Sequence, residues 1–248
     1  MLQNFESLVL IWLCIGFITF ITLLKIPAPY GKFSKTNWGP MIPSKLGWIV
    51  MEIISPLALL YFFLNGNIEK TPTNITFISL WTLPYFNRSI IYPLRQNNPA
   101  KMPLLIAVLA FLFNVMNGYI NGTYFGSIQE YSAEYMSNWN FVVGVCLFIT
   151  GAYINIKSDN ILLSLRSKSG EYKTPEGFMF RYVSFPNYLG EILEWMAFAI
   201  MTWSLAGLSF MIWTMANLVP RAIKGHQWYH DKFESYPKNR KAIFPFII

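Results

Sequence analysis

The sequence has little charge. Asp, Glu, Lys and Arg make up 12% of its 248 residues, against roughly 25% in an average soluble domain. Hydrophobic residues make up 54% and aromatic residues 18%. In water, a chain with so few charged side chains would expose contiguous apolar patches that drive association. The composition therefore indicates an integral membrane protein and excludes a disordered chain.

Cysteine and the common catalytic motifs are scarce as well. Cys14 and Cys146 are the two cysteines, and both lie in apolar runs, which excludes a disulfide scaffold. No G-x-G-x-x-G, P-loop, G-x-S-x-G or H-E-x-x-H motif occurs, so a Rossmann site and the standard hydrolases are not expected. His226 and His230 are spaced like metal ligands, but no carboxylate or thiol stands at a recognised spacing, and no metal site is predicted.

The apolar windows predict seven membrane-spanning helices in a single domain over residues 1–248. A spanning helix needs about 20 mainly apolar residues. The expected helices cover about residues 5–25, 46–64, 72–94, 102–121, 139–164, 186–203 and 206–220, and a polar tail follows over 221–248. The first segment has no basic flank and no cleavage site of the Ala-x-Ala kind, so it is expected to stay as a helix.

The positive charges set the expected orientation. Lys and Arg number 19 against 12 Asp and Glu, a net charge of +7, but they are spread between apolar segments, so nucleic acid is not an expected partner. When 186–220 is read as two helices, every Lys and Arg except Lys70 falls on one side. The positive-inside rule then places the N-terminus outside and the C-terminal tail in the cytoplasm.

Polar side chains recur at helical spacing near the cytoplasmic ends of four helices, and each such group at membrane depth is a site hypothesis. The stripes are Glu52; Tyr85, Arg88 and Tyr92; Asn155, Asp159 and Arg166; and Asn187, Glu191 and Glu194. Together they predict a polar cavity open to the cytoplasm. The alternative is interhelical hydrogen bonds, worth about 0.6 kcal/mol each. Packing is the expected role of a glycine series and an asparagine series on the fourth helix, Gly118, Gly122 and Gly126 with Asn114, Asn117 and Asn121.

The C-terminal third carries recognisable motifs. The runs NYLGEILEW (187–195), ANLVPR (216–221) and WYHDKFESYPKNRK (228–241) resemble the steroid 5α-reductase family. Upstream, YGK (30–32), Glu52, YFNR (85–88) and NIKSDNILLSLR (155–166) also look like that family. The sequence departs from the family pattern at Met51, where mammalian members carry Gln, and at Lys224-Gly225-His226, which replaces a run of His.

The resemblance implies a seven-helix membrane enzyme that uses NADPH to reduce the 4,5 double bond of a 3-oxo-Δ4-steroid to the 5α-steroid. Glu52 and Tyr85 match the pair that binds the steroid 3-carbonyl. The positions that match cofactor-binding residues are Lys32, Asn155, Asp159, Arg166, Tyr172, Asn187, Glu191, Arg221 and Tyr229.

These residue types suit that chemistry. Hydride arriving at C5 pushes negative charge onto the carbonyl oxygen, so hydrogen-bond donors aimed at this oxygen stabilise the transition state. Tyr85 can donate as it stands, whereas Glu52 can donate only when protonated, the form that burial favours. Arg166 and Arg221 suit phosphate groups, and Asn187 with Glu191 could bind an amide or a hydroxyl of the nucleotide.

Other functions stay open at this point. One is reduction of another lipid enone or of a trans-2-enoyl-CoA, and another is a lipid-binding or transport bundle without chemistry. A methyltransferase using S-adenosylmethionine is less favoured, because Arg166, Arg221 and Lys32 suit a ligand with several phosphates. The expected protein is a monomer in a bacterial inner membrane, with the endoplasmic reticulum membrane as the alternative.

Overall fold

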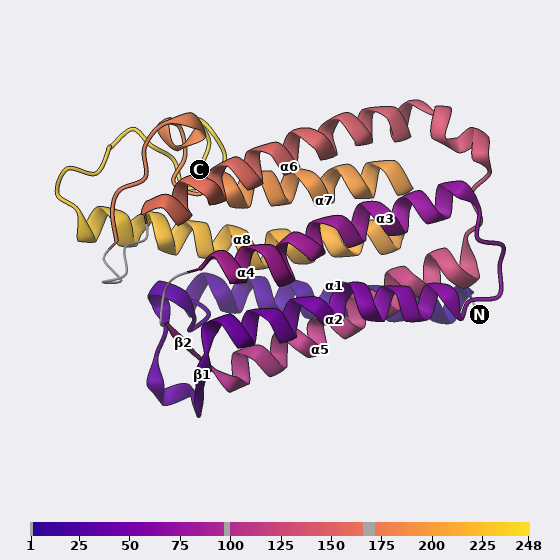
Figure 1. Ribbon diagram of the computed structural model, residues 1–248, viewed down its shortest axis with the longest axis horizontal. Coiled ribbons are helices and arrows are strands. Elements are labelled where there is room, and N and C mark those ends of the chain that lie inside the picture. The colour runs from indigo at the N-terminus through magenta and orange to yellow at the C-terminus, as the bar shows by residue number, and fades with distance from the viewer. Residues whose placement is uncertain (1, 97–99, 166–171) are drawn as a thin grey trace. The chain divides into compact units, whose positions relative to one another are not determined.

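The computed structural model describes residues 2–96, 100–165 and 172–248, and helices dominate it (Figure 1). The longer helices are α1 (Leu2–Lys25), α2 (Ser44–Leu64), α3 (Pro72–Phe86), α5 (Leu104–Thr123), α6 (Trp139–Leu165), α7 (Pro186–Thr202) and α8 (Leu205–Lys232). The third expected helix is made of three pieces, since α3 continues through a π-helical turn, η3 (Asn87–Ile91), into α4 (Tyr92–Arg95).

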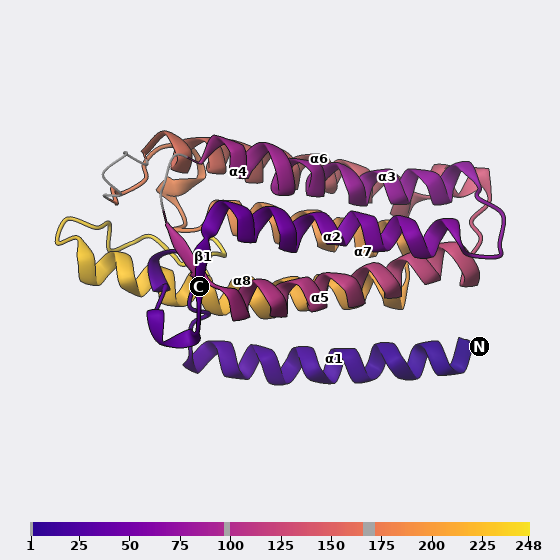
Figure 2. The ribbon, with the colours of Figure 1, turned by 60° about the horizontal axis from the view of Figure 1, so that its bottom comes forward.

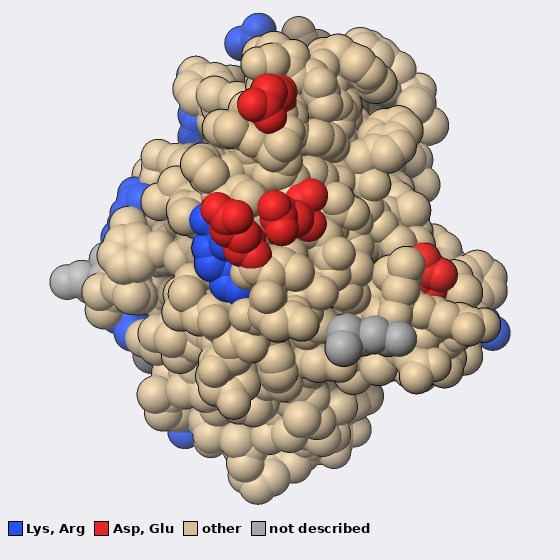
Figure 3. All heavy atoms as spheres, turned by 90° about the vertical axis from the view of Figure 1, so that its right-hand side faces the viewer, with Lys and Arg blue, Asp and Glu red and all other residues tan. Residues whose placement is uncertain are grey.

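Four helices of the described chain are long and apolar enough to cross a membrane: α1, α2, α5 with the π-helical turn η4 (Tyr124–Ile128), and α6. The fold is therefore that of an all-α membrane protein. The other expected spans are less apolar or shorter, because α7 has 17 residues and α8 ends in a polar stretch. Charged groups are also sparse on the face drawn in Figure 3, where acidic side chains gather near the middle.

Contacts within the chain define two compact units. Unit 1 comprises residues 1–9 and 28–142, and unit 2 comprises residues 10–27 and 143–248. The division falls inside α1 and α6, so each of these helices contributes to both units.

In unit 1, helices α2 and α5 each follow one strand of a short two-stranded sheet. β1 (Met41–Pro43) pairs antiparallel with β2 (Lys101–Pro103), and α2 and α5 follow these strands directly. A Cβ on Gly118 would lie 2.6 Å from the Ala58 Cβ, and one on Gly122 would lie 2.6 Å from the Leu59 carbonyl oxygen. The glycine series thus serves close packing, as expected. In Figures 1 and 2, α2 lies between α3 and α5.

In unit 2, α7 packs against α6 and α8. A Cβ on Gly190 of α7 would lie 2.5 Å from the backbone nitrogen of Asn155 in α6, so the two backbones touch. α7 turns sharply into α8 at Trp203, whose φ is +45°. The Ser204 hydroxyl then caps α8 by accepting from the backbone N–H of Gly207 at 2.9 Å.

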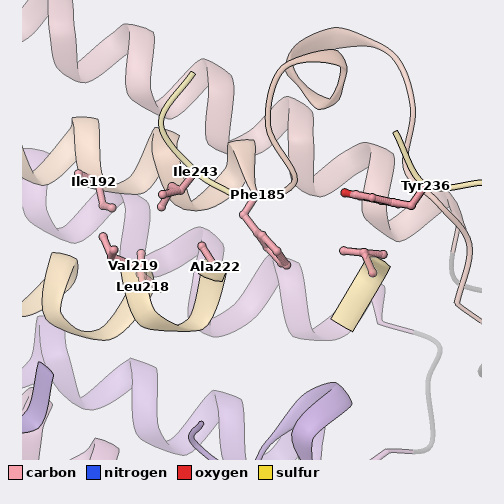
Figure 4. Close-up of a cluster of buried hydrophobic side chains, with 8 residues drawn as sticks. Phe185, Ile192, Leu218, Val219, Ala222, Tyr236 and Ile243 are labelled. Atoms are coloured by element: carbon pink, nitrogen blue, oxygen red, sulfur yellow. The ribbon is translucent and has the colours of Figure 1, made fainter. Parts of the chain in front are cut away.

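The C-terminal segment of unit 2 folds back onto the start of α7. The backbone N–H of Ser184 donates to the Lys241 carbonyl at 2.8 Å, and that of Lys241 donates to the Tyr182 carbonyl at 2.9 Å. This pairing delivers Ile243, which is fully buried, to an apolar cluster with Ile192 of α7 and Leu218 of α8 (Figure 4). Ile243 is therefore part of the core of unit 2, whereas Phe246 and Ile247 beyond it are exposed.

Candidate functional site

An ion pair joins α2 to the π-helical turn of unit 1. The Glu52 side chain is 8% exposed, and its Oε1 accepts from Nη2 of Arg88 at 3.2 Å. Its Oε2 accepts from Nε of Arg88 at 3.4 Å. Both carboxylate oxygens therefore accept hydrogen bonds from one guanidinium, in a forked arrangement. In this arrangement Glu52 is an acceptor, whereas the carbonyl-binding role expected from the sequence requires a donor.

Tyr85 lies one turn before Arg88 and is 4% exposed. Its hydroxyl donates to Oδ1 of Asn114 in α5 at a long distance of 3.5 Å, and Nδ2 of Asn114 donates to the Met51 carbonyl at 2.6 Å. Met51 precedes Glu52, so Glu52, Tyr85 and Arg88 all belong to one connected cluster. The Met51 side chain itself packs in an apolar group with Met102 and Ala107.

The π-helical turn explains why the sequence spacing alone did not define this cluster. A π turn inserts an extra residue into a helix and is often found at functional sites. Here it spans Asn87–Ile91, so the residues after Tyr85 depart from regular α-helical spacing. The sequence singled out Arg88 only as part of a polar stripe and did not pair it with Glu52.

In unit 2, three expected cofactor residues meet. Nδ2 of Asn155 donates to the Asn187 carbonyl at 2.9 Å, and Nδ2 of Asn187 donates to Oδ1 of Asp159 at 3.0 Å. The close approach of α6 and α7 at Gly151 and Gly190 makes these short side chains sufficient to span the gap. The contact between Asn187 and Asp159 is a hydrogen bond from a neutral amide to a carboxylate, whereas unit 1 has an ion pair.

One atom of this group has an unmet hydrogen-bonding capacity. Oδ1 of Asn187 is buried and accepts no hydrogen bond from the described residues. A buried acceptor without a donor costs about 1–3 kcal/mol, so such an atom in a folded protein calls for an explanation. A ligand amide or hydroxyl is a donor of the right kind.

The remaining expected cofactor residues are spread over both units. Arg221 in α8 is 9% exposed, and its Nε donates to the Tyr188 hydroxyl at 3.1 Å. Tyr229 stacks on Tyr236 with ring centroids 5.1 Å apart. The Tyr172 ring contacts the Trp228 ring, and Glu191 lies half-buried on α7. Lys32 lies in unit 1 beside Phe33. Arg166 is outside the described residues.

A second polar network of unit 2 was missed from the sequence. The Tyr236 hydroxyl donates to Oγ of Ser184 at 2.7 Å, and Oγ lies 2.6 Å from Nδ1 of His226. Nη1 of Arg240 donates to the Tyr236 hydroxyl at 3.2 Å. Partial burial, with help from the nearby His230, Arg240 and Lys241, lowers the pKa of His226 to about 4. Ser184 lies 42 residues before His226 and 52 before Tyr236, so no spacing rule connects it to them.

The fold and the two polar clusters define an α-helical membrane protein with buried ionisable groups. Residues 100–248 match the family model described as 3-oxo-5-alpha-steroid 4-dehydrogenase. The chain is 43% identical over 248 residues to steroid 5-alpha-reductase DET2 of Solanum lycopersicum, covering 98% of this chain and 96% of that protein. It is 36% identical over 238 residues to 3-oxo-5-alpha-steroid 4-dehydrogenase 1 of Rattus norvegicus, covering 94% and 91%.

The chain therefore belongs to the steroid 5α-reductase family, and it is an oxidoreductase that acts on CH–CH groups. The resemblance seen in the sequence motifs is confirmed. The relatives named above come from a plant and a mammal, so the expectation of a bacterial inner membrane finds no support, whereas the endoplasmic reticulum fits.

Proposed function

We propose that the protein reduces the 4,5 double bond of 3-oxo-Δ4-steroids to 5α-steroids with NADPH, in the endoplasmic reticulum membrane. The observation that carries the proposal is the Glu52, Arg88 and Tyr85 cluster, buried in a chain that is 43% identical to a steroid 5-alpha-reductase over nearly its whole length. A buried phenol and a buried carboxyl are the groups needed to polarise a ketone.

The Tyr85 hydroxyl donates a hydrogen bond to the steroid 3-carbonyl oxygen. Its present acceptor, Oδ1 of Asn114, is 3.5 Å away, and a hydrogen bond of that length is weak and easily exchanged for a better acceptor. As the double bond takes up hydride, negative charge grows on the carbonyl oxygen, and the bond from Tyr85 strengthens. That difference between ground state and transition state is what accelerates the reaction.

Glu52 is the second group in this proposal and must change state to act. Protonation turns one carboxylate oxygen into a donor and removes the negative charge that holds Arg88. The ion pair therefore opens as Glu52 becomes able to bind the substrate carbonyl. Until then the hydrogen bonds from Arg88 hold both carboxylate oxygens in an acceptor role.

NADPH fits the polar group of unit 2. The unpartnered Oδ1 of Asn187 matches an amide or hydroxyl donor, and the Arg221 guanidinium matches a phosphate. Bound there, NADPH would supply hydride to C5, while C4 takes a proton from water or a side chain. Asp159 holds the Asn187 side chain so that its oxygen stays free for the ligand, and Asn155 ties the start of α7 to α6. Lys32, Arg166, Tyr172, Glu191 and Tyr229 complete the proposed cofactor-binding set.

The topology is part of the same proposal. Seven crossings with the N-terminus outside put every Lys and Arg except Lys70 on the cytoplasmic side. The ammonium of Lys70 is stabilised locally by hydrogen bonds, because its Nζ donates to the carbonyls of Gly66 at 2.9 Å and Ile68 at 2.7 Å. NADPH would then reach its residues from the cytoplasm.

The test is a turnover assay on the purified protein. With NADPH and testosterone, we expect NADPH oxidation and formation of the 5α-reduced product, identified by mass spectrometry and chromatography. The substrate panel should include a trans-2-enoyl-CoA and a non-steroidal lipid enone. Absence of NADPH oxidation with every 3-oxo-Δ4-steroid would show that the proposal is wrong.

A further inference from the structure

Asn114 is a buried amide in the middle of α5, and it touches two helices at once. It is 4% exposed, and from the sequence alone only a packing role was expected for it. Its Nδ2 donates to the Met51 carbonyl of α2 at 2.6 Å, and its Oδ1 accepts from the Tyr85 hydroxyl of α3 at 3.5 Å. Asn114 therefore contacts the backbone beside Glu52 and the side chain of Tyr85.

The short bond to Met51 fixes which way the amide points. A backbone carbonyl can only accept a hydrogen bond, so the amide atom 2.6 Å from it must be the nitrogen. The oxygen of Asn114 then faces Tyr85. Since an amide oxygen carries no hydrogen, the Tyr85 hydroxyl must be the donor in this pair.

The backbone of α2 is weakened next to the Met51 carbonyl that Asn114 binds. Pro56 has no N–H, so the carbonyl of Glu52 lacks its usual helical donor and α2 is weakened there. One turn along α5, a Cβ on Gly118 would lie 2.8 Å from the backbone nitrogen of Leu59, so the two helices are in close contact. At that separation an asparagine side chain is long enough to reach the carbonyl of Met51.

We propose that Asn114 is a positioning residue for Tyr85: anchored on α2, it holds the phenol proton ready for the substrate carbonyl. This inference rests on the proposed function. The anchor on Met51 keeps the amide from flipping, so the Asn114 atom that faces the phenol is the oxygen, an acceptor. The 3.5 Å separation keeps this bond weak enough for the Tyr85 hydroxyl to redirect its hydrogen bond to the carbonyl oxygen of the substrate at little cost.

A double-mutant cycle tests this role, using Asn114→Leu, Tyr85→Phe and the combined variant. Leu has nearly the shape of Asn and forms no hydrogen bond. In the wild-type background we expect Asn114→Leu to lower kcat about tenfold or more, as small misplacements of catalytic groups do. NADPH affinity, measured by quenching of tryptophan fluorescence, should not change. In the Tyr85→Phe background the same substitution should lower kcat about threefold or less.

The control is Asn121→Leu on the same helix. Asn121 is fully buried, and its Nδ2 donates to the Asn117 carbonyl within α5 at 3.2 Å, so it shares the burial of Asn114 without the link to α2. It should lower kcat about twofold or less in both backgrounds. Asn114→Ala, which removes the amide without adding bulk, repeats the cycle if Asn114→Leu does not give a monodisperse protein.

The outcomes separate the two proposals. An active wild-type enzyme in which Asn114→Leu lowers kcat by the same factor with and without the Tyr85 hydroxyl overturns the role of Asn114 and leaves the proposed function standing. A wild-type enzyme that reduces no 3-oxo-Δ4-steroid overturns the proposed function, and the role of Asn114 with it.

Discussion

The polar clusters of the two units differ in how fully their hydrogen bonds are satisfied. In unit 1, both oxygens of Glu52 are engaged by Arg88, and Tyr85 donates to Asn114. In unit 2, Asn187 donates to Asp159 but keeps a buried oxygen without a donor among the described residues. The first cluster must rearrange to accept a ligand, whereas the second already presents an open acceptor. Substrate polarisation and cofactor binding should therefore respond differently to mutation.

The largest effect is expected at Tyr85. Tyr85→Phe removes one proposed donor to the carbonyl oxygen and should lower kcat by about 10²- to 10³-fold, the usual loss for one such donor. Glu52→Gln should also lower kcat, because an amide is a weaker hydrogen-bond donor to the carbonyl oxygen than the carboxylic acid proposed here. Steady-state kinetics with a 3-oxo-Δ4-steroid measure the loss, and NADPH affinity should be retained.

Tyr61→Phe is the matched control, since Tyr61 is 61% exposed on α2. If Tyr85→Phe proves as active as Tyr61→Phe, the phenol of Tyr85 does not act on the carbonyl.

Asn187→Leu should lower the affinity for NADPH. The substitution removes the open acceptor and the bond to Asp159, and hydrogen bonds of this kind are worth about 1–3 kcal/mol when one partner is left buried. We expect NADPH affinity to fall about tenfold or more, as measured by isothermal titration calorimetry on the detergent-purified protein. Asn160→Leu, at an exposed position of α6, should bind NADPH like the wild type. Equal affinities for both variants would remove Asn187 from the site.

Substitution of one tightly packed glycine in each unit tests whether the two units have separate roles. A Cβ on Gly190 would meet the backbone of Asn155 at 2.5 Å, and one on Gly122 would meet the Leu59 carbonyl oxygen at 2.6 Å. Overpacking of this kind costs about 1–3 kcal/mol, part of which alanine's better helix propensity offsets. Gly190→Ala and Gly122→Ala should both lower the thermal unfolding temperature. NADPH affinity should fall only in Gly190→Ala, and a loss in both variants would contradict separate roles for the units.

The smallest effect concerns pH. His226 has its pKa lowered to about 4 in the folded protein, from 6.5, because partial burial disfavours the charged imidazole. The unfolded chain therefore binds more protons between these two values, so folding stability is complete above pH 6.5 and declines as the pH falls toward 4. His226 is partly exposed, and solvent screening keeps the effect modest.

Thermal unfolding measured from pH 4 to pH 7 checks this expectation. His226→Gln should flatten the dependence, whereas His230→Gln, at an exposed position one turn later on α8, should keep most of it. Equal slopes for the wild type and His226→Gln would assign the pH dependence to other groups.

Helix positions were accessible from the sequence because hydrophobic runs report them directly. The expected helix over 186–203 runs from Pro186 to Thr202, and the one expected over 72–94 is the succession of α3, η3 and α4. The β1 and β2 pair was missed because each strand has three residues, too few for a periodic pattern. The π-helical turn at Arg88 was missed because its sequence does not differ from that of an α-helix.

The sequence alone determined that the chain is an apolar helical membrane protein, that it belongs to its enzyme family, and which polar residues stand out. Composition, run length and motifs are local properties, so they can be read without coordinates. Only the tertiary structure decided that Arg88 pairs with Glu52 and that Asn114 joins Met51 to Tyr85. It also decided that no donor from the described part of the chain reaches Oδ1 of Asn187. Such pairings depend on which helix faces meet and on how closely they approach. Gly118 and Gly190 allow that close approach between segments that are distant in the sequence.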